Sequence, residues 1–260
     1  MKPLRLTCCP NLRDLGDLPA QAGLRIRPRR LIRAGALHEI SAEEAKSLGK
    51  LLAIFDLRSE TERRFKPDPN FGADYYHMPL TEKGRRKLIH SKKTLEDKVV
   101  DIIAGYNRGE NLASVRMRKI YRSLVLSHQT ANCLEQIIHI LNAEPEGAVL
   151  WHCSVGKDRA GVIAAILLRL LTVPEELIYE DYLYTNVALQ HELEEAESLA
   201  FSLSGDPAVA SYVKGFFAAC PCWLKAALDT VDHCGSVEQY LLQNTKLEQA
   251  DFNKFRAACL

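Results

Sequence analysis

The stretch 148-AVLWHCSVGKDRAGVIAAILLRLL-171 constrains the fold more than any other part of this 260-residue chain. It opens with a short apolar run that is typical of a buried strand. A polar turn containing Gly156 follows, and then a second apolar run that is long enough for a buried helix. The pattern therefore predicts a strand, a short loop and a helix, with cysteine, lysine, aspartate and arginine side chains crowded into the loop.

A loop in this position is suited to bind an anion. In α/β sheets, ligands lie at the carboxyl ends of strands, where the next helix begins with unpaired N–H groups. Arg159 would add a planar fork of donors for two phosphate oxygens, and the same positive surroundings favour the thiolate form of Cys153. We therefore expect Cys153 to act as a nucleophile on phosphorus, without a metal or cofactor. The expected phosphate-binding residues are Ser154, Val155, Gly156, Lys157, Asp158 and Arg159.

The spacing Cys-x5-Arg in 152-HCSVGKDRAG-161 resembles the signature of the cysteine-dependent phosphatases. The stretches 11-NLRDLGDL-18, 56-DLRSETE-62 and 236–260 resemble the bacterial and fungal tyrosine-phosphatase-like family, whose loop reads HCxxGKDRTG. The resemblance runs from about residue 9 to the end of the chain. It implies a phosphatase that forms a phosphocysteine intermediate. Within that class it favours a protein-tyrosine phosphatase, for which dual specificity is an open alternative. Phosphorylated proteins or phosphoinositides would be its substrates.

The resemblance also assigns roles to Asp158 and Lys157. Asp158 would be the general acid, because the thiolate and the phosphate favour a protonated carboxyl beside them. Alternatively it only complements the helix dipole, and the acid is then Asp56 or Asp74. Lys157 would add affinity for multiply phosphorylated headgroups, or else it is a solvated loop lysine.

Four residues are expected to support the loop from behind. His152 is predicted to be a buried hydrogen-bond partner of the loop, and Asp56 and Arg58 follow the apolar run 51–55 at the same sheet edge, where they could also face the substrate. Ala160 replaces the family's threonine, whose hydroxyl normally bonds the thiolate. We expect hydrolysis of the phosphocysteine to limit turnover. The segment 11–14, with Asn11, Arg13 and Asp14, is expected to be locked onto the core by hydrogen bonds.

Three other functions were weighed against this one. A rhodanese-type sulfurtransferase has a shorter cysteine loop. A cysteine protease would need a distant histidine for Cys153, and no family-specific pairing is visible. A catalytically weak module that only binds phosphate is favoured by Ala160 and disfavoured by the intact Cys153, Asp158 and Arg159.

The surrounding sequence predicts an α/β fold in one domain over residues 1–260. Alternating apolar and basic residues in 24–34 suggest a surface hairpin, and a capping box at Ser41 predicts a helix over 42–50. Strands are expected at 51–55, 75–80 and 148–152, with helices over 94–143 and after Pro174. This gives a small, mostly parallel sheet wrapped by helices, with a helix-rich C-terminal half. Helices within about 84–143 and 186–235 could form a lid, or could simply pack around the sheet.

Net charge and cysteine content limit the possible binding partners and the cellular compartment. A net charge of +1 argues against nucleic-acid binding, and no apolar run is long enough for stable membrane insertion. Without an apparent leader, the eight cysteines are expected to be reduced in the cytoplasm, although leaderless export stays open. A zinc site at Cys220, Cys222, His233 and Cys234 is disfavoured because the spacing matches no common pattern. The basic run 83–87 could steer an acidic substrate or be a solvated loop.

Overall fold

The computed structural model describes residues 2–4, 9, 11–80, 94–110 and 115–260, and the basic run 83–87 lies outside them. The described chain forms a six-stranded sheet in the order β1-β2-β3-β6-β4-β5. The last four strands in this order are parallel, and β1 and β2 add an antiparallel edge. The predicted α/β class with a mostly parallel sheet is confirmed. The strands are β1 (Lys2–Pro3), β2 (Arg13–Asp14), β3 (Leu31–Ala34), β4 (Leu51–Asp56), β5 (Asp74–His77) and β6 (Ala148–His152).

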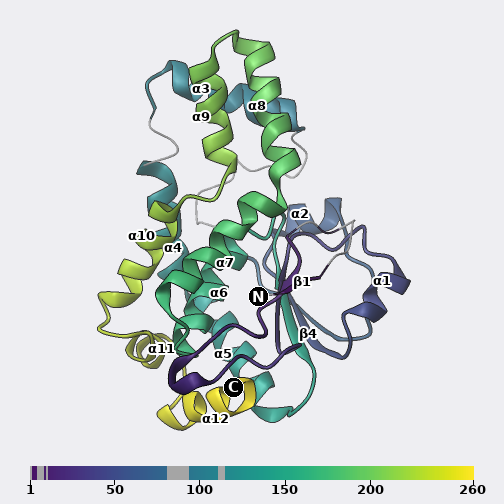
Figure 1. The fold of residues 1–260 in the computed structure, drawn as a ribbon, viewed down its shortest axis with the longest axis vertical. Coiled ribbons are helices and arrows are strands. Elements are labelled where there is room, and N and C mark those ends of the chain that lie inside the picture. Colours follow the sequence, from purple (N-terminus) through teal and green to yellow (C-terminus); the bar gives the residue numbers. More distant parts are fainter. Residues whose placement is uncertain (1, 5–8, 10, 81–93, 111–114) are drawn as a thin grey trace.

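Helices cover both faces of the sheet (Figure 1). The helices are α1 (Ala42–Ser47), α2 (Glu60–Phe65), α3 (Leu95–Asn107), α4 (Met117–Val125), α5 (His128–Ala143), α6 (Asp158–Leu170), α7 (Glu175–Ala188), α8 (Gln190–Ser204), α9 (Pro207–Phe217), α10 (Pro221–Asp232), α11 (Val237–Asn244) and α12 (Gln249–Cys259). Because side chains alternate along a strand, Trp151 of β6 joins the large core under α5 and α6, while Leu150 joins a smaller core under α1. Strand β6 is thus buried on both faces.

Several element boundaries follow from local sequence signals. Ser41 and Glu44 form the predicted capping box, and α1 ends at Ser47, shortly before Gly49 at a φ of 78°. A second capping box joins Ser59 and Glu62 at the start of α2. Strands β4 and β6 lie where the apolar runs predicted them, and β5 is shifted slightly to Asp74–His77.

The predicted surface hairpin at 24–34 is wrong. Arg25 forms only an isolated bridge with Pro19, and β3 is an inner strand between β2 and β6 with all four residues buried. Arg33 is buried there because Asp181 of α7 pairs with it. Alternating basic residues suggest a solvent-exposed face, whereas here a tertiary ion pair neutralises the buried arginine.

Helices α3, α8 and α9 form an apolar cluster of their own, through residues such as Ile102, Ala200 and Val213. Figure 1 shows these three helices together at one end of the long axis, beyond the helices that cover the sheet. Helices α4, α5 and α10 instead contribute to the large core. Among the described helices, none combines the length and the apolar character that crossing a membrane requires.

Candidate active site

The loop between β6 and α6, residues 153–157, holds the predicted site. Strand β6 ends at His152, Cys153 follows with 2% of its surface exposed, and α6 begins at Asp158. Gly156 has a φ of 74°, and a Cβ there would lie 2.7 Å from the carbonyl atoms of Ala34. Only glycine fits this backbone conformation at such a close approach. The tight turn carries the chain from the end of the strand directly into the helix N-terminus.

The carbonyl groups of the loop point toward the N-terminal part of the chain. Asn11 Nδ2 donates to the Val155 carbonyl at 2.9 Å, and a guanidinium nitrogen of Arg33 donates to the Gly156 carbonyl at 2.7 Å. When successive carbonyls are held outward, the intervening N–H groups turn toward the opposite, concave side. This arrangement, at the first turn of α6, is compatible with anion binding by the loop.

Arg159 is oriented by a carboxylate that the sequence reasoning missed. Its two terminal nitrogens donate to the two carboxylate oxygens of Glu62 at 3.0 and 2.9 Å, and one also donates to the Leu57 carbonyl. Ser154 Oγ donates to the same Glu62 carboxylate. Burial disfavours the charged forms, but the mutual attraction holds the pKa of Glu62 far below its usual value. The charges of Cys153 and Glu62 likewise raise the pKa of Arg159 despite its burial.

This bidentate pair leaves a specific part of Arg159 for a ligand. In the described part of the chain, the Arg159 hydrogen bonds use only the two terminal nitrogens. The Nε–H group is therefore available to a phosphate oxygen. A guanidinium already fixed on one side loses little conformational entropy when it binds on the other.

Asp158 lies in the first turn of α6 with about a third of its side chain exposed. Tyr121 of α4 donates a hydrogen bond of 2.6 Å to its Oδ1, and the Tyr182 hydroxyl of α7 is 2.6 Å from the Tyr121 hydroxyl. Burial and the Asp158 charge raise the pKa of Tyr121 well above its usual value, so this phenol stays a donor. Helix α4 thus holds one oxygen of Asp158 directly, and α7 supports it through the Tyr121 hydroxyl.

Lys157 points away from solvent. Its Nζ donates to the Phe217 carbonyl at 2.8 Å and the Ala218 carbonyl at 3.2 Å, at the C-terminal end of α9, and it lies 5.1 Å from the centre of the Trp223 ring. Burial lowers the pKa of Lys157, against the opposing charge of Asp158. The alternative of a solvated loop lysine is wrong, because this lysine ties the loop to the α9–α10 junction.

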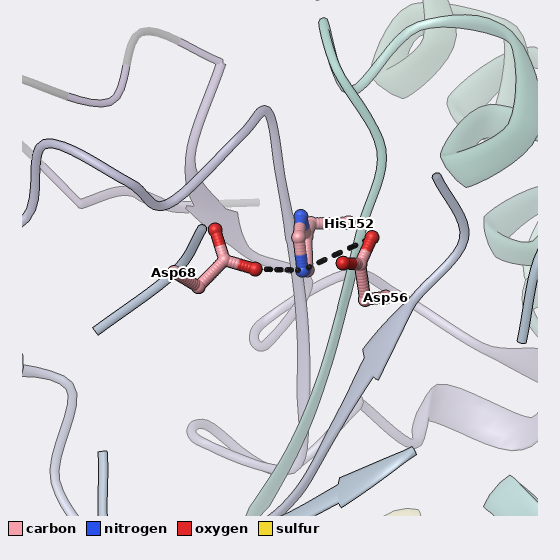
Figure 2. A group of neighbouring side chains, drawn as sticks. All are labelled: Asp56, Asp68 and His152. Atoms are coloured by element: carbon pink, nitrogen blue, oxygen red, sulfur yellow. Dashed lines mark ion pairs between the residues drawn. The ribbon is translucent and has the colours of Figure 1, made fainter. Parts of the chain in front are cut away.

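His152 has a different neighbourhood from the one predicted (Figure 2). The ring is fully buried, and its Nε2 lies 3.2 Å from an Asp68 oxygen and 3.7 Å from an Asp56 oxygen. No hydrogen bond from the ring to the loop is present in the described structure. The predicted hydrogen bond to the loop is therefore wrong, and His152 instead lies between two carboxylates beneath the loop.

Asp56 and Arg58 also lie beneath the loop. Both side chains are about 1% exposed or less, and Arg58 donates to both oxygens of Asp56 and to Asp68. Burial would raise the pKa of Asp56, but the Arg58 hydrogen bonds and the charge of His152 lower it overall. The pair is thus oriented inward, and the idea that it faces substrate is wrong.

Two groups of residues contain side chains of the kinds that bind metal ions. Asp56, Asp68 and His152 are the one set with ligand spacing in the described chain, but Arg58 already neutralises both carboxylates and fills the position of a cation. In the disfavoured zinc set, Cys220 and Cys222 lie at the start of α10, whereas His233 and Cys234 lie beyond its end. A helix of this length separates the two pairs by about 15 Å or more.

The N-terminal segment is locked onto the core, as predicted for Asn11, Arg13 and Asp14. Arg13 Nε donates to Asp181 of α7 at 2.6 Å, and Arg33 pairs with the other oxygen of the same carboxylate. Burial and the nearby Arg33 lower the pKa of Arg13 to about 10. Because Asn11 and Arg33 also hold the loop carbonyls, Asp181 connects α7 to the backbone of the site.

Other predicted or conspicuous features lie elsewhere. Asp74, one fallback for the general acid, is exposed and pairs with Ala53 in the first part of β4, at the sheet end opposite the loop. A surface depression of about 800 Å³ is lined by Gln21, Thr172, Arg256 and neighbours, and contains no loop residue. The chemistry of the loop, rather than the size of a cavity, identifies the site.

The sequence reasoning missed four residues of this site: Glu62, Asp68, Tyr121 and Asp181. A signal existed only for Glu62, which closes the stretch 56-DLRSETE-62 and stands three residues after the cap Ser59. Tyr121, Asp181 and Asp68 lie in α4, in α7 and in the chain after α2. Their positions near the loop depend on how these segments pack.

An α/β sheet that ends in a cysteine–arginine phosphate loop defines a phosphate-ester hydrolase. The profile of the tyrosine phosphatase family matches residues 4–260, so the chain belongs to this family. It is 25% identical to the triple specificity protein phosphatase PtpB of Mycobacterium tuberculosis, over 96% of each chain. It is 27% identical to a Cupriavidus necator protein provisionally named a tyrosine-protein phosphatase, over 92% of this chain and 83% of that one. A tyrosine-protein phosphatase of Nostoc commune is 46% identical over 48 residues, 18% of this chain and 16% of that protein.

Proposed function

We propose that this phosphatase hydrolyses phosphotyrosine in proteins through a phosphocysteine at Cys153. The thiolate attacks phosphorus, and the P–S bond forms as the bond to the phenolic oxygen breaks. Arg159 Nε and the loop amides stabilise the charge on the phosphoryl oxygens. Water then attacks phosphorus and releases phosphate and the thiolate. The observation that carries the proposal is the bidentate Glu62–Arg159 pair, which presents a fixed cation beside Cys153.

Asp158 is proposed as the group that moves the proton. Protonated, it gives its proton to the leaving phenolate, and as a carboxylate it accepts a proton from the attacking water. Tyr121 binds one carboxyl oxygen and leaves the other for the substrate. The exposed third of the side chain supports access to a leaving group.

Substrate class is proposed from Lys157. A lysine that binds a second phosphate needs N–H donors that have no other partner. The ammonium group of Lys157, however, donates to backbone carbonyls at the end of α9. This favours phosphorylated protein over phosphoinositide as the main substrate. PtpB is named a triple specificity protein phosphatase, which supports a broader range, and we propose dual specificity as a secondary property.

The proposal is tested by phosphate release from a phosphotyrosine peptide, a phosphoserine peptide and a panel of phosphoinositides. We expect fastest release from the phosphotyrosine peptide, and none above background with Cys153→Ser. Asp158→Asn should slow release by about 10²-fold or more, most strongly for poor leaving groups. Release confined to phosphoinositides would reverse the substrate assignment. Binding of phosphopeptide without release by the native chain would favour the phosphate-binding module.

Tyr121→Phe tests the role of Tyr121 in positioning Asp158. Loss of the hydroxyl should lower kcat about tenfold, because Asp158 is then misplaced. The change in KM should be smaller, because the groups that bind phosphate are unchanged. The loss in kcat should be larger for alkyl phosphates than for nitrophenyl phosphates, because a nitrophenolate leaving group needs no proton. Tyr240→Phe is the matched control, since its buried hydroxyl donates to Val125 instead. Equal losses with both substrates would contradict the role.

Two further expectations remain proposals. We propose that the part of the chain formed by α3, α8 and α9 acts as a lid within a single domain, supported by its separate apolar cluster. A cytoplasmic location is supported by six free thiols, those of Cys133, Cys153, Cys220, Cys222, Cys234 and Cys259, because reducing compartments keep thiols unpaired.

A further inference from the structure

Two thiols meet at the start of α10. Cys220 is the N-cap residue, Pro221 is the first helical residue, and Cys222 follows in the first turn. Both are free thiols that are only partly buried, and their sulfur atoms lie 2.7 Å apart. A disulfide bond is about 2.0 Å long, so very little movement would join them.

The thiol pair is bracketed by the two contacts of Lys157. The carbonyl of Ala218, which accepts from Lys157 Nζ, lies two residues before Cys220. The Trp223 ring, over which the same ammonium group lies, directly follows Cys222. Cys220 is also close enough for its charge to affect the pKa of Lys157. A change of geometry between residues 220 and 222 would therefore act on the lysine of the phosphate loop.

We propose that Cys220 and Cys222 are a reversible redox-modification site, oxidised to an intrachain disulfide by small-molecule disulfides such as oxidised glutathione. The thiolate of Cys220 attacks a sulfur of the oxidant and forms a mixed disulfide, and one glutathione thiolate leaves. Cys222 then loses its proton to solvent and attacks the Cys220 sulfur, which releases the second glutathione thiolate. Two electrons pass from the thiol pair to the oxidant, which departs as two reduced molecules.

The order of attack and the reversibility follow from the local structure. Burial and the hydrogen bond with Cys220 raise the pKa of Cys222 to about 11, so Cys222 keeps its proton until the mixed disulfide has formed. Closing so short a loop removes little entropy from the unfolded chain, so the disulfide gains little of the stability that protects structural disulfides. Reduced glutathione in excess would reopen it.

The effect on the phosphate loop rests on the proposed function. Moving the Ala218 carbonyl or the Trp223 ring weakens the hold on Lys157 and loosens the loop that binds phosphate. We expect the oxidised protein to bind a phosphotyrosine peptide several-fold more weakly than the reduced protein does.

The test uses the full chain with Cys153→Ser, because Cys153 would itself react with the oxidant. The protein is incubated with oxidised glutathione, alkylated under denaturing conditions, digested and mapped by mass spectrometry. We expect the peptide with residues 220–222 to lose two hydrogen masses and to escape alkylation until it is reduced. With Cys222→Ser added, glutathione should remain attached at Cys220. With Cys234→Ser added as the matched control, the disulfide should still form.

Binding of the phosphotyrosine peptide to the reduced and oxidised protein completes the test. Alkylation of both Cys220 and Cys222 after oxidant treatment, or a pairing of either with another cysteine, would overturn the proposed site. A mapped disulfide with unchanged peptide affinity would overturn the link through Lys157. If the reduced protein binds no phosphopeptide, the proposed function fails, while the mapped disulfide is still decided independently.

Discussion

Glu62 illustrates how one side chain can control the chemistry of this site. It accepts hydrogen bonds from Arg159 and from Ser154. It also forms a capping box with Ser59, which stabilises the first turn of α2. A carboxylate with these bonds sets the plane of the guanidinium. The orientation of Arg159, the proposed phosphate clamp, is therefore determined by a residue 97 positions earlier in the chain.

Glu62→Gln should lower kcat/KM by roughly 10²-fold, since a small misplacement of Arg159 weakens its contact with the transferring phosphoryl group. Steady-state kinetics with a phosphotyrosine peptide measures the loss. Glu60→Gln is the matched control on the same helix, because among the described residues Glu60 pairs with the more exposed Arg63 and Arg64 and with His77. Similar kinetics for the two variants would show that Glu62 has no positioning role.

Ala160 is the second residue with a direct kinetic consequence. If hydrolysis of the phosphocysteine limits turnover because the thiolate lacks a hydroxyl donor, Ala160→Thr should raise kcat several-fold, by roughly the worth of one charge-assisted hydrogen bond. Ala160 is fully buried, so the larger side chain could also strain the core. Ala160→Ser supplies the hydroxyl with less volume. An unchanged kcat in both folded variants, and no burst of product in the native chain, would refute this expectation.

At the scale of the element, the β6–loop–α6 unit is the part of the site that depends most on backbone geometry. The strand carries Cys153, the proposed nucleophile, to the sheet edge, and the helix N-terminus supplies N–H groups and a positive dipole end. The glycine between them allows the loop to pass directly over β3. Side chains bind the phosphate only if this backbone path is kept.

Gly156→Ala should destabilise the fold by more than the usual penalty of about 1 kcal/mol for a side chain at positive φ. Its Cβ would lie 2.7 Å from backbone atoms of Ala34, which cannot rotate away. Gly205→Ala is the matched control, since Gly205 has a φ of 66° and open space around it. Urea unfolding of both variants gives the two free energies. Equal losses would mean that the crowding at Gly156 is relieved without strain.

For the whole molecule, Asp181 links parts of the chain that are far apart in sequence. Its carboxylate neutralises Arg13 of β2 and Arg33 of β3, and these strands contact the loop. All three side chains are buried, so the ion pairs are shielded from solvent and salt. Removing the carboxylate would leave two cations buried side by side.

Asp181→Asn should reduce the free energy of unfolding at pH 7 by about 3–5 kcal/mol, because breaking a buried ion pair leaves uncompensated charge. The two arginines hold the pKa of Asp181 below its usual value despite burial. A carboxylate with a lowered folded-state pKa stabilises the fold above its unfolded-state value, and this contribution is lost as pH falls. The difference between native and variant should therefore shrink below about pH 4.

Urea unfolding over a pH series measures this effect. Asp229→Asn is the control, because Asp229 pairs with Lys225 on the surface of α10, and its loss should change stability by about 1 kcal/mol or less. A small loss for Asp181→Asn at neutral pH, or one that does not change with pH, would contradict the buried network.

The sequence by itself determined the features whose parts are neighbours along the chain. Cys153, Asp158 and Arg159 fall within seven residues, so their proximity follows once a strand and a helix flank them. The capping box at Ser41 and the apolar runs of β4 and β6 are equally local, because hydrogen bonding and burial there depend on residues a few positions apart. These patterns also sufficed for the α/β class.

Only the tertiary structure decided which side chains surround the loop. Glu62 and Tyr121 bond residues of the site across long stretches of chain, and Asp181 acts on the loop through Arg33. The spacing of residues along one element does not show which polar group of another element it will meet. The incorrect hairpin at 24–34 has the same cause, since a buried Arg33 and a solvated arginine look alike in sequence. Buried charge is stable only when its partner is present, and that partner is supplied by the packing of distant helices.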